Sequence, residues 1–330
     1  HNIATSDIQH CHYITLTFMY KHKENGKPEF SVLMASYNNS QYIGRAIESV
    51  INQTFKEWEL VIVDDSSTDK SVEVIRTYLT DGRVKFFRNR RNIGYIRTLR
   101  RLINESGSAI LGILDSDDVL REDALEKMYE AHVKNPDCGF IYSNFVFCDQ
   151  DLTPVEKGFC TALPQIPERK TILRYDLVSH FRTFKRDGYL GTPGYDDEIL
   201  YAEDKDLILK MEEVTDFVFI DEVLYFYRVL SDSQSHDPAK KGMMKSSYYL
   251  AKYKAYRRRL GTEIPNLTNK EMSDVLFHGI PHCMKAGNWR RAGFFLFEAM
   301  KLFPLNLKGW LQLFFRGAKF LPKMFFRKIP

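Results

Sequence analysis

Four short apolar runs, each followed by a polar loop and a helical pattern, constrain the fold of this 330-residue chain most strongly. The runs are rich in Val, Ile, Leu and Phe, which is typical of strands buried on both faces. Strands that alternate with helices indicate parallel βαβ units with helices on both faces of one sheet. The sequence therefore predicts an α/β fold whose first four strands cover residues 30–35, 58–63, 83–88 and 109–114.

Polar segments lie at the carboxyl ends of three of these strands. The first is the loop Ser36–Asn39, the second is the pair Asp64-Asp65, and the third is the cluster Asp115–Asp118. Ligands of open parallel sheets bind at the carboxyl ends of the strands. We therefore expect the three segments to belong to one site.

The cluster Asp115–Asp118 places three carboxylates within four residues. Carboxylates this close repel one another, and burying them without a partner is costly. A divalent cation removes that cost. Mg²⁺ or Mn²⁺ prefers such oxygen ligands and usually holds the phosphates of a substrate as well. The alternative is a solvated acidic turn that caps the helix expected to begin near Arg121.

Three acidic residues, Glu203, Asp204 and Asp206, open a helix that the sequence predicts over residues 202–211. Carboxylates in a first turn interact favourably with the positive end of the helix dipole. Simple capping of the helix would also explain them. The other expected elements in this part are a helix over 122–135, a strand over 139–147, a loop over 149–170 and a strand over 217–227.

Several common signatures are absent from the sequence. The first strand is followed by neither G-x-G-x-x-G nor G-x-x-x-x-G-K-[ST], which argues against a dinucleotide-binding protein and a P-loop NTPase. The G-x-S-x-G elbow of esterases is also missing. The five cysteines are scattered and contain no C-x-x-C pair, which favours a reducing, cytoplasmic compartment and argues against structural zinc.

Charge is distributed unevenly along the chain. Residues 236–330 contain 19 Lys and Arg against 5 Asp and Glu, a net charge of +14, which leaves −10 for residues 1–235. The basic region lacks strand patterns, so we expect helices there. Its end, 305–330, combines basic residues with Trp and Phe, a composition that fits a helix at the inner face of a membrane. The alternative is a helix packed on the protein, and we expect no nucleic-acid partner because no reading motif accompanies the charge.

Five motifs together resemble those of the family 2 glycosyltransferases, which are GT-A-fold enzymes that use nucleotide sugars. The match covers about residues 30–228, in the family's order. The resemblance implies a GT-A-type, Rossmann-like, mostly parallel sheet and a nucleotide-diphosphate sugar donor, with a UDP-sugar favoured. It also implies a divalent metal, Mn²⁺ or Mg²⁺. The motifs are segments 30–38, 51–69, 92–94, 114–118 and 202–207, which read FSVLMASYN, INQTFKEWELVIVDDSSTD, NIG, LDSDD and AEDKDL.

The resemblance implies donor-binding roles for individual residues. Asp117 would bind the metal that bridges the diphosphate. Asp115 would approach the ribose and is a further candidate metal ligand. The other donor-binding candidates are Ala35, Ser36, Tyr37 and Asn38 around the nucleoside, Asp64 or Asp65 at the base, and Asn92, Gly94 and Ser116.

On the acceptor side, the resemblance implies that Asp204 is the general base. A sugar hydroxyl is a poor nucleophile, and a carboxylate within hydrogen-bond reach can remove its proton during in-line attack. Direct displacement would invert the anomeric centre. Secondary candidates on this side are Glu203, Asp197 and Arg228.

The chain departs from the family pattern in two places. Many relatives carry a metal-binding His two residues after the Tyr-Arg that closes the last strand. Here Leu230 occupies that position, and His236 is the nearest candidate substitute. Relatives also often show Arg-Asn on the helix after the Asn-x-Gly turn. Here Leu99-Arg100 stands there, so Arg97 and Arg100 are weak phosphate candidates.

These features predict a metal-dependent, inverting glycosyltransferase of the hexosyltransferase type, acting on a glycan or lipid-linked glycan in polysaccharide, lipopolysaccharide or glycan assembly. The alternatives are a non-catalytic sugar-nucleotide-binding protein of the same fold and a nucleotidyltransferase. The expected organisation is an N-terminal extension at 1–29, a catalytic domain at 30–235 and a basic helical region at 236–330.

Overall fold

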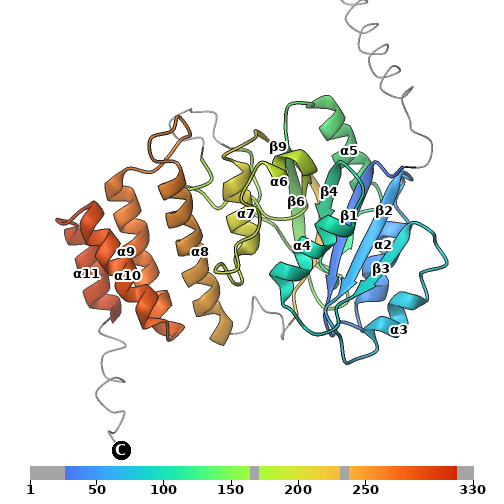
Figure 1. Ribbon diagram of the computed structural model, residues 1–330, viewed down its shortest axis with the longest axis horizontal. Helices are drawn as coiled ribbons and strands as arrows, with labels where there is room; N and C mark the ends of the chain where they lie inside the picture. Colours follow the sequence, from blue (N-terminus) through green and yellow to red (C-terminus); the bar gives the residue numbers. More distant parts are fainter. Residues whose placement is uncertain (1–26, 164–170, 231–237, 318–330) are drawn as a thin grey trace, which may run out of the picture.

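The computed structural model of the chain describes residues 27–163, 171–230 and 238–317. Figure 1 shows two parts that lie side by side: one is built on a β-sheet, and the other is a row of helices from the end of the chain. The boundary expected at residues 235–236, most of the N-terminal extension and His236 all lie outside the described residues. The division into domains therefore stays a prediction.

The four apolar runs form parallel strands in the order β3-β2-β1-β4, as the sequence predicts. Strands β1, β2 and β4 are almost wholly buried because helices cover both faces, whereas β3 is a partly exposed edge strand. The elements are β1 (Phe30–Ser36), α2 (Ile43–Ile51), β2 (Trp58–Asp64), α3 (Ser71–Arg76), β3 (Val84–Arg88), α4 (Tyr95–Glu105) and β4 (Ile110–Ile113).

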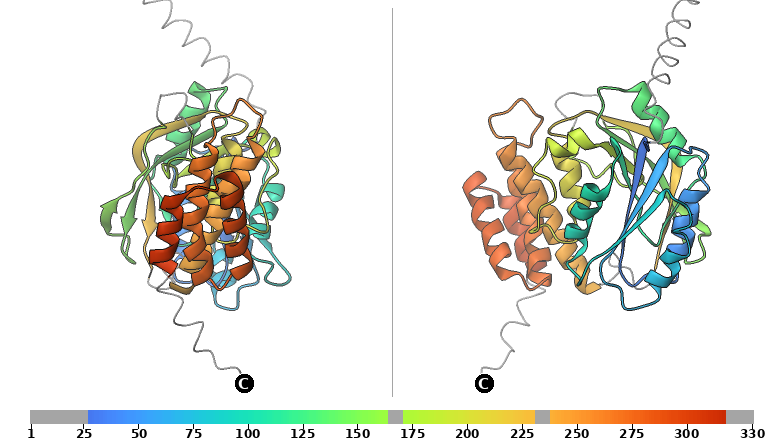
Figure 2. Two further views of the ribbon diagram at one scale, coloured as in Figure 1. Left: turned by 90° about the vertical axis from the view of Figure 1, so that its left-hand side faces the viewer. Right: turned by 45° about the vertical axis from the view of Figure 1, so that its right-hand side comes forward.

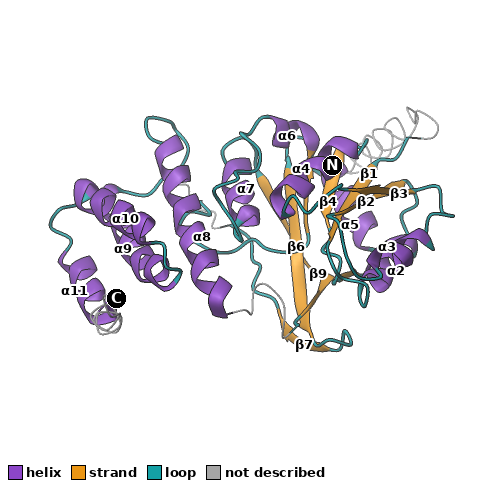
Figure 3. Ribbon diagram, turned by 60° about the horizontal axis from the view of Figure 1, so that its bottom comes forward, coloured by secondary structure: helices purple, strands orange, loops and turns teal. Residues whose placement is uncertain are grey.

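Along the chain, the side of the sheet on which each new strand is placed changes between β3 and β4. From β1 to β3 each strand joins one side of the sheet, and β4 then joins the other side of β1. Right-handed connections that run in opposite directions place their helices on opposite faces. Figure 3 shows α4 on one side of these strands and the pair α2 and α3 on the other. The carboxyl ends of β1 and β4 therefore flank a crevice, where ligands of such sheets bind.

The second half of the sheet is mixed. β8 lies antiparallel between β4 and β6, and β9 pairs in parallel with β6. Within the described residues, six of the nine strands run in one direction, so the sheet is mostly parallel, as predicted. The elements are β5 (Val119–Leu120), α5 (Ala124–Lys134), β6 (Phe140–Cys148), β7 (Pro154–Lys157), β8 (Arg182–Lys185), α6 (Arg186–Leu190), α7 (Glu203–Met211) and β9 (Phe217–Arg228).

The loop expected over 149–170 is partly wrong. β7 forms a short edge strand that pairs antiparallel with β6 through Val146 and Phe147. All four residues of β7 are exposed, so no alternation of apolar and polar residues marks it in the sequence. Pairing with β6, not local pattern, holds this strand in place.

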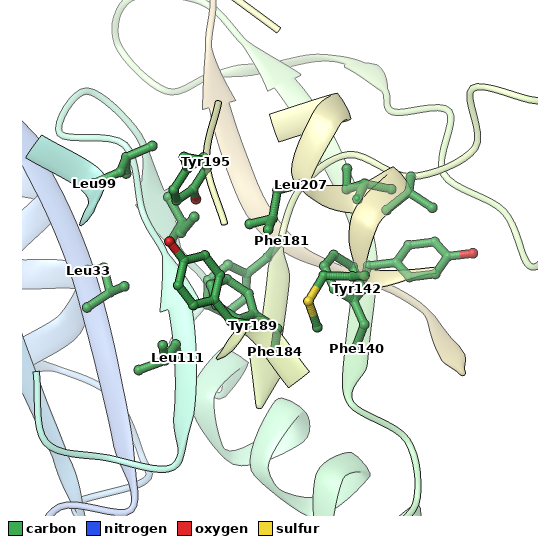
Figure 4. Close-up of a cluster of buried hydrophobic side chains, with 14 of the residues drawn as sticks. Leu33, Leu99, Leu111, Phe140, Tyr142, Phe181, Phe184, Tyr189, Tyr195 and Leu207 are labelled. Carbon is green, nitrogen blue, oxygen red and sulfur yellow. The ribbon is translucent and has the colours of Figure 1, made fainter. Parts of the chain in front are cut away.

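Aromatic side chains fill the core between the two halves of the sheet (Figure 4). Leu111 of β4 lies near Phe184 of β8, which stacks with Phe140 of β6 at a ring separation of 6.4 Å. Gly112 of β4 is needed for close packing, because a Cβ atom there would approach the Phe30 ring to 2.8 Å. This core holds β8 beside β4 and so sets the relative positions of the loops at their ends.

The last third of the described chain is a row of helices, as the sequence predicts. α8 packs against α7 on the sheet side and against α9 on the other, and α9 also packs against α10 and α11 (Figure 2). α9 begins with a capping box between Thr268 and Glu271. No helix among the described residues could cross a membrane. The row comprises α8 (Pro238–Arg258), α9 (Asn269–Lys285), α10 (Trp289–Leu302) and α11 (Leu307–Gly317).

Candidate active site

The loops after β1 and β4 meet at the crevice. The Asn39 side-chain amide donates a hydrogen bond to Ser116 Oγ at 2.8 Å, which joins the two loops directly. The loop after β2 is tied to β1, because the Asp65 backbone N–H donates to the Ser36 carbonyl at 2.8 Å. The structure thus brings together the three polar segments that the sequence singles out. Tyr37 is half exposed at this edge.

Asp64 and Asp65 are buried and act as local anchors. Asp64 accepts hydrogen bonds from the Ser67 backbone and hydroxyl and from Arg88. Asp65 accepts from Asn89 at 2.7 Å and from the backbone N–H groups of Ile93 and Gly94, both at 2.9 Å. Gly94 has a φ of 89°, a conformation that glycine adopts without strain. Both carboxylates therefore hold the loops around the predicted nucleoside position, a role that the sequence does not reveal.

The cluster after β4 divides into carboxylates with different surroundings. Asp118 is 1% exposed and accepts hydrogen bonds from the Tyr225 hydroxyl at 2.6 Å and the Arg228 backbone N–H at 2.7 Å. Burial raises the pKa of Asp117 to about 6, and the charge of Asp115 adds to the shift. Asp115 accepts a hydrogen bond from the Tyr95 hydroxyl at 2.8 Å. Asp118 is thus held by hydrogen bonds within the fold, and Asp115 and Asp117 remain the candidate functional pair.

The alternative of a solvated turn that caps the next helix is wrong. Strand β5 separates the cluster from α5, whose N-cap residue is Asp123. Arg228 also holds the acidic turn in place, because its Nε donates to the Asp117 carbonyl at 2.6 Å and its guanidinium lies 4.7 Å from the centre of the Tyr42 ring. Arg228, a secondary acceptor candidate from the sequence, therefore contacts the donor-side turn.

The pair Asp115 and Asp117 fits a cation that is shared with a substrate. The described residues contain no group of three or more His, Cys, Asp or Glu that could hold a metal by themselves. Mg²⁺ and Mn²⁺ in phosphate-binding sites commonly use one or two carboxylates, and substrate oxygens and water complete the shell. Burial and the charge of Asp115 together raise the pKa of Asp117. A divalent cation would relieve the repulsion between the two carboxylates.

A buried arginine that no sequence motif singles out joins the two sides of the site. Arg182 is 5% exposed, and its Nε has no hydrogen-bond partner among the described residues. Burial lowers the pKa of this guanidinium, but the charges of Asp204 and Asp115 outweigh the effect and raise it. Arg182 therefore interacts with both functional carboxylates. One signal in the sequence could have identified Arg182 as a candidate site residue: it lies between Phe181 and Phe184. Charged side chains are almost never fully buried unless they are paired.

Three acids of α7 have three different surroundings. Asp206 is buried and pairs with Lys210 at 2.5 Å, so it is structural. Burial and the charge of Asp204 raise the pKa of Glu203 to about 8. Glu203 is therefore mainly protonated at neutral pH and is not free to accept a proton. The N-cap residue of α7 is Ala202, so none of the three acids occupies the N-cap position, and the helix has no side-chain capping bond.

Asp204 lies in the wall of a cavity of about 270 Å³. The cavity opens beside the ends of β6 and β9 and is bounded by α7 and by the start of α8. Its walls are mainly aromatic, with side chains from Phe145, Phe147, Phe159, His180, Tyr201, Tyr227 and Tyr248. A ring-shaped, partly apolar molecule suits such a surface.

Asp197, another candidate from the sequence, does not line this cavity. Asp197 is exposed and pairs with Arg100 at 3.0 Å and with Arg97 at 3.9 Å, so both candidate phosphate-binding arginines already have a partner. His236 lies outside the described residues. Asn92 accepts a hydrogen bond from the Gly94 backbone and shapes the turn that Asp65 anchors.

Comparisons with known proteins agree with this geometry. Residues 31–190 match the model of glycosyl transferase family 2. The chondroitin synthase of Escherichia coli is 30% identical over 199 residues, which are 60% of this chain and 28% of that protein. The hyaluronan synthase of Pasteurella multocida is 27% identical over 238 residues, 71% of this chain and 24% of that protein. This chain thus spans about a quarter of the length of either synthase.

Solved structures support the same fold. The crystal structure of S. aureus TarS 1-349 in complex with UDP-GlcNAc superimposes with a TM-score of 0.62 at 15% identity, covering 83% of this chain and 81% of that one. The chain therefore has the fold of these GT-A structures, with a carboxylate cluster at the switch point of its sheet. The match at 31–190 thus identifies a glycosyl transferase family 2 region in this chain.

Proposed function

We propose that this protein transfers a sugar from a nucleotide-diphosphate sugar, with a UDP-sugar favoured, to an acceptor hydroxyl, with inversion and with Mn²⁺ or Mg²⁺. The observation that carries the proposal is that the buried Arg182 interacts electrostatically both with Asp115, in the turn after β4, and with Asp204, in the wall of the cavity. A site with both a cation-binding pair and a base beside a cavity has what direct displacement requires.

On the donor side, Asp115 and Asp117 would hold the cation, which stabilises the charge that grows on the leaving diphosphate. Tyr37 is exposed at the crevice and would lie against the nucleoside together with Ala35, Ser36 and Asn38. Asp64 and Asp65 would act mainly by fixing the loops that shape this pocket, because most of their lone pairs are already used within the protein.

On the acceptor side, Asp204 would accept the proton of the attacking hydroxyl. Glu203 is the poorer candidate because it is mainly protonated at neutral pH. Arg182 would help to position Asp204, because its buried guanidinium interacts with the charge of that carboxylate. This assignment gives the two neighbouring acids different roles.

The wider role that we propose is polysaccharide or glycan assembly, which is supported by the names of the two synthases that the chain resembles in part. The exposed apolar residues Leu305, Leu307 and Leu311 precede a basic segment, and we propose that 305–330 contacts an anionic membrane surface. Co-sedimentation with anionic vesicles at low and high salt tests the contact, which is contradicted if full-length protein stays in the supernatant at low salt.

The function is tested by a donor-hydrolysis screen across UDP-, GDP- and dTDP-sugars with Mn²⁺, with Mg²⁺ and with EDTA. We expect metal-dependent release of one nucleoside diphosphate. A protein that binds a nucleotide sugar but never cleaves it would instead be the non-catalytic alternative. Release of pyrophosphate from a sugar phosphate and a nucleoside triphosphate would support the nucleotidyltransferase alternative.

A further inference from the structure

The cavity beside Asp204 is completed by α8, a helix outside the region that matches the family model. α8 contributes Met244, Lys245 and Tyr248 to its wall. Lys245 and Lys252 are one turn on either side of Tyr248 and therefore share its face of the helix. The Nζ of Lys252 lies 4.8 Å from the centre of the Tyr248 ring, and that of Lys245 lies 5.9 Å from it.

α8 contains no acidic residue, and its other basic residues toward the C-terminal end have carboxylate partners. Lys254 pairs with Asp196 and Glu198 at 2.7 Å each, and Arg258 pairs with Glu213 at 2.7 Å. In the part of the chain that the structure describes, Lys245 and Lys252 make no such ion pair, and both ammonium groups instead lie near the Tyr248 ring.

The acidic groups at the cavity interact with other cations, and neither makes an ion pair with Lys245 or Lys252 in the described part of the chain. Asp176 is bound by Lys205 at 2.6 Å, and Asp204 is balanced by the buried Arg182. Burial lowers the pKa of Lys252 to about 8; the charge of Asp176 opposes this shift, and the neighbouring Lys205 and Lys245 add to it. The cavity therefore combines an aromatic wall with positive charge that lacks a counter-ion within the described part of the protein.

We propose that this cavity binds the acceptor, and that the acceptor is a glycan that carries a carboxylate or phosphate group next to the sugar to be extended. The proposal rests on the function proposed above, because Asp204 marks the attacking hydroxyl. The aromatic wall would pack against the apolar face of a sugar ring. Lys245, which lines the cavity, would bind the anion, and the charge of Lys252 beside Tyr248 would add to the attraction. A lysine is a point charge, so it accepts either anion.

The test compares three disaccharides that differ in one group: cellobiose, cellobiouronic acid and cellobiose 6′-phosphate. Binding to the full chain is measured by calorimetry and saturation-transfer NMR in the presence of UDP and Mn²⁺. We expect at least one anionic disaccharide to bind roughly tenfold more tightly than cellobiose, the usual size of a charge-assisted contact. The stronger of the two identifies the preferred anion.

The variant Lys245→Gln should lose this preference, while Lys301→Gln, which removes an exposed charge from α10, should keep it. Lys252→Gln is a second variant on the Tyr248 face of α8. For each variant, UDP affinity and thermal unfolding show whether the protein is folded. Equal binding of all three disaccharides, or an unchanged preference in folded Lys245→Gln, overturns the proposal. Failure of the wild-type protein to bind UDP would instead contradict the proposed function.

Discussion

The proposed donor side and the proposed acceptor side of the site are built in different ways. The donor side consists of short loops at the ends of β1, β2 and β4, and its polar groups are fixed by hydrogen bonds between those loops. The acceptor side collects residues from β6, β8, β9, α7 and α8, which are more than a hundred positions apart at the extremes. Neighbouring residues leave a motif in the sequence, whereas dispersed residues do not.

This difference also appears in the electrostatics. On the donor side, burial and the like charge of Asp115 raise the pKa of Asp117. On the acceptor side, one buried cation and one protonated acid surround Asp204. A substitution should therefore affect metal-dependent binding on one side and proton transfer on the other.

The largest expected effect is on the acceptor side. Asp204→Asn keeps the shape of the side chain and removes its basicity, so transfer should slow by roughly 10²–10⁴-fold, with donor affinity unchanged. Glu203→Gln is the matched control, because Glu203 is already mainly protonated at neutral pH, and its rate should change much less. Steady-state rates with saturating donor measure both. A larger loss in Glu203→Gln would reverse the assignment of the base.

On the donor side, Asp117→Ala should remove most of the Mn²⁺-dependent part of UDP affinity, a loss of about 100-fold, because one of two candidate ligands is lost. Asp118→Asn is the control from the same turn. It should mainly reduce stability, by about 1–3 kcal/mol, since it disturbs a buried hydrogen-bonded group. Calorimetry with and without Mn²⁺ and urea unfolding separate the two effects. If folded Asp117→Ala kept full metal-dependent affinity, the pair would not be the cation site.

The smallest effect concerns the stability of the acceptor-side scaffold. His132 of α5 is buried and interacts with Thr183 of β8 at 2.9 Å, next to Arg182. Burial lowers its pKa to about 3, with a smaller contribution from Lys185. The unfolded chain has a pKa near 6.5 at this residue, so the neutral imidazole stabilises the fold above pH 6.5. That stabilisation is lost by up to about 1.4 kcal/mol per pH unit as the pH falls toward 3.

The variant His132→Gln tests this linkage. Its urea-unfolding free energy should depend less on pH between 7.5 and 5 than that of the wild-type protein, by roughly 2 kcal/mol over the interval. His278, a partly exposed residue of α9, provides the control variant His278→Gln, which should leave the pH dependence unchanged. Identical pH profiles for His132→Gln and the wild-type protein would show that His132 charges freely in the fold.

The sequence determined the order of the elements and the donor side. Burial on both faces demands continuous apolar runs, so β1, β2 and β4 are visible without a structure, as are the polar ends where their loops meet. The edge strand β3 is recognised from its place in the alternation of strands and helices. The division of Asp115–Asp118 into a functional pair and a structural acid was not visible, because it depends on Tyr225 and Arg228, about 110 residues away.

Only the tertiary structure decided how the acceptor side is assembled. Arg182, Asp204 and Lys245 lie in separate segments, and nothing local in any of them indicates the other two. β7 likewise forms because it pairs with β6, and its own four residues carry no strand pattern. Local sequence specifies which side chains each segment buries and where the segment turns. Electrostatic interactions and strand pairing between distant segments form only when packing of the core brings those segments together.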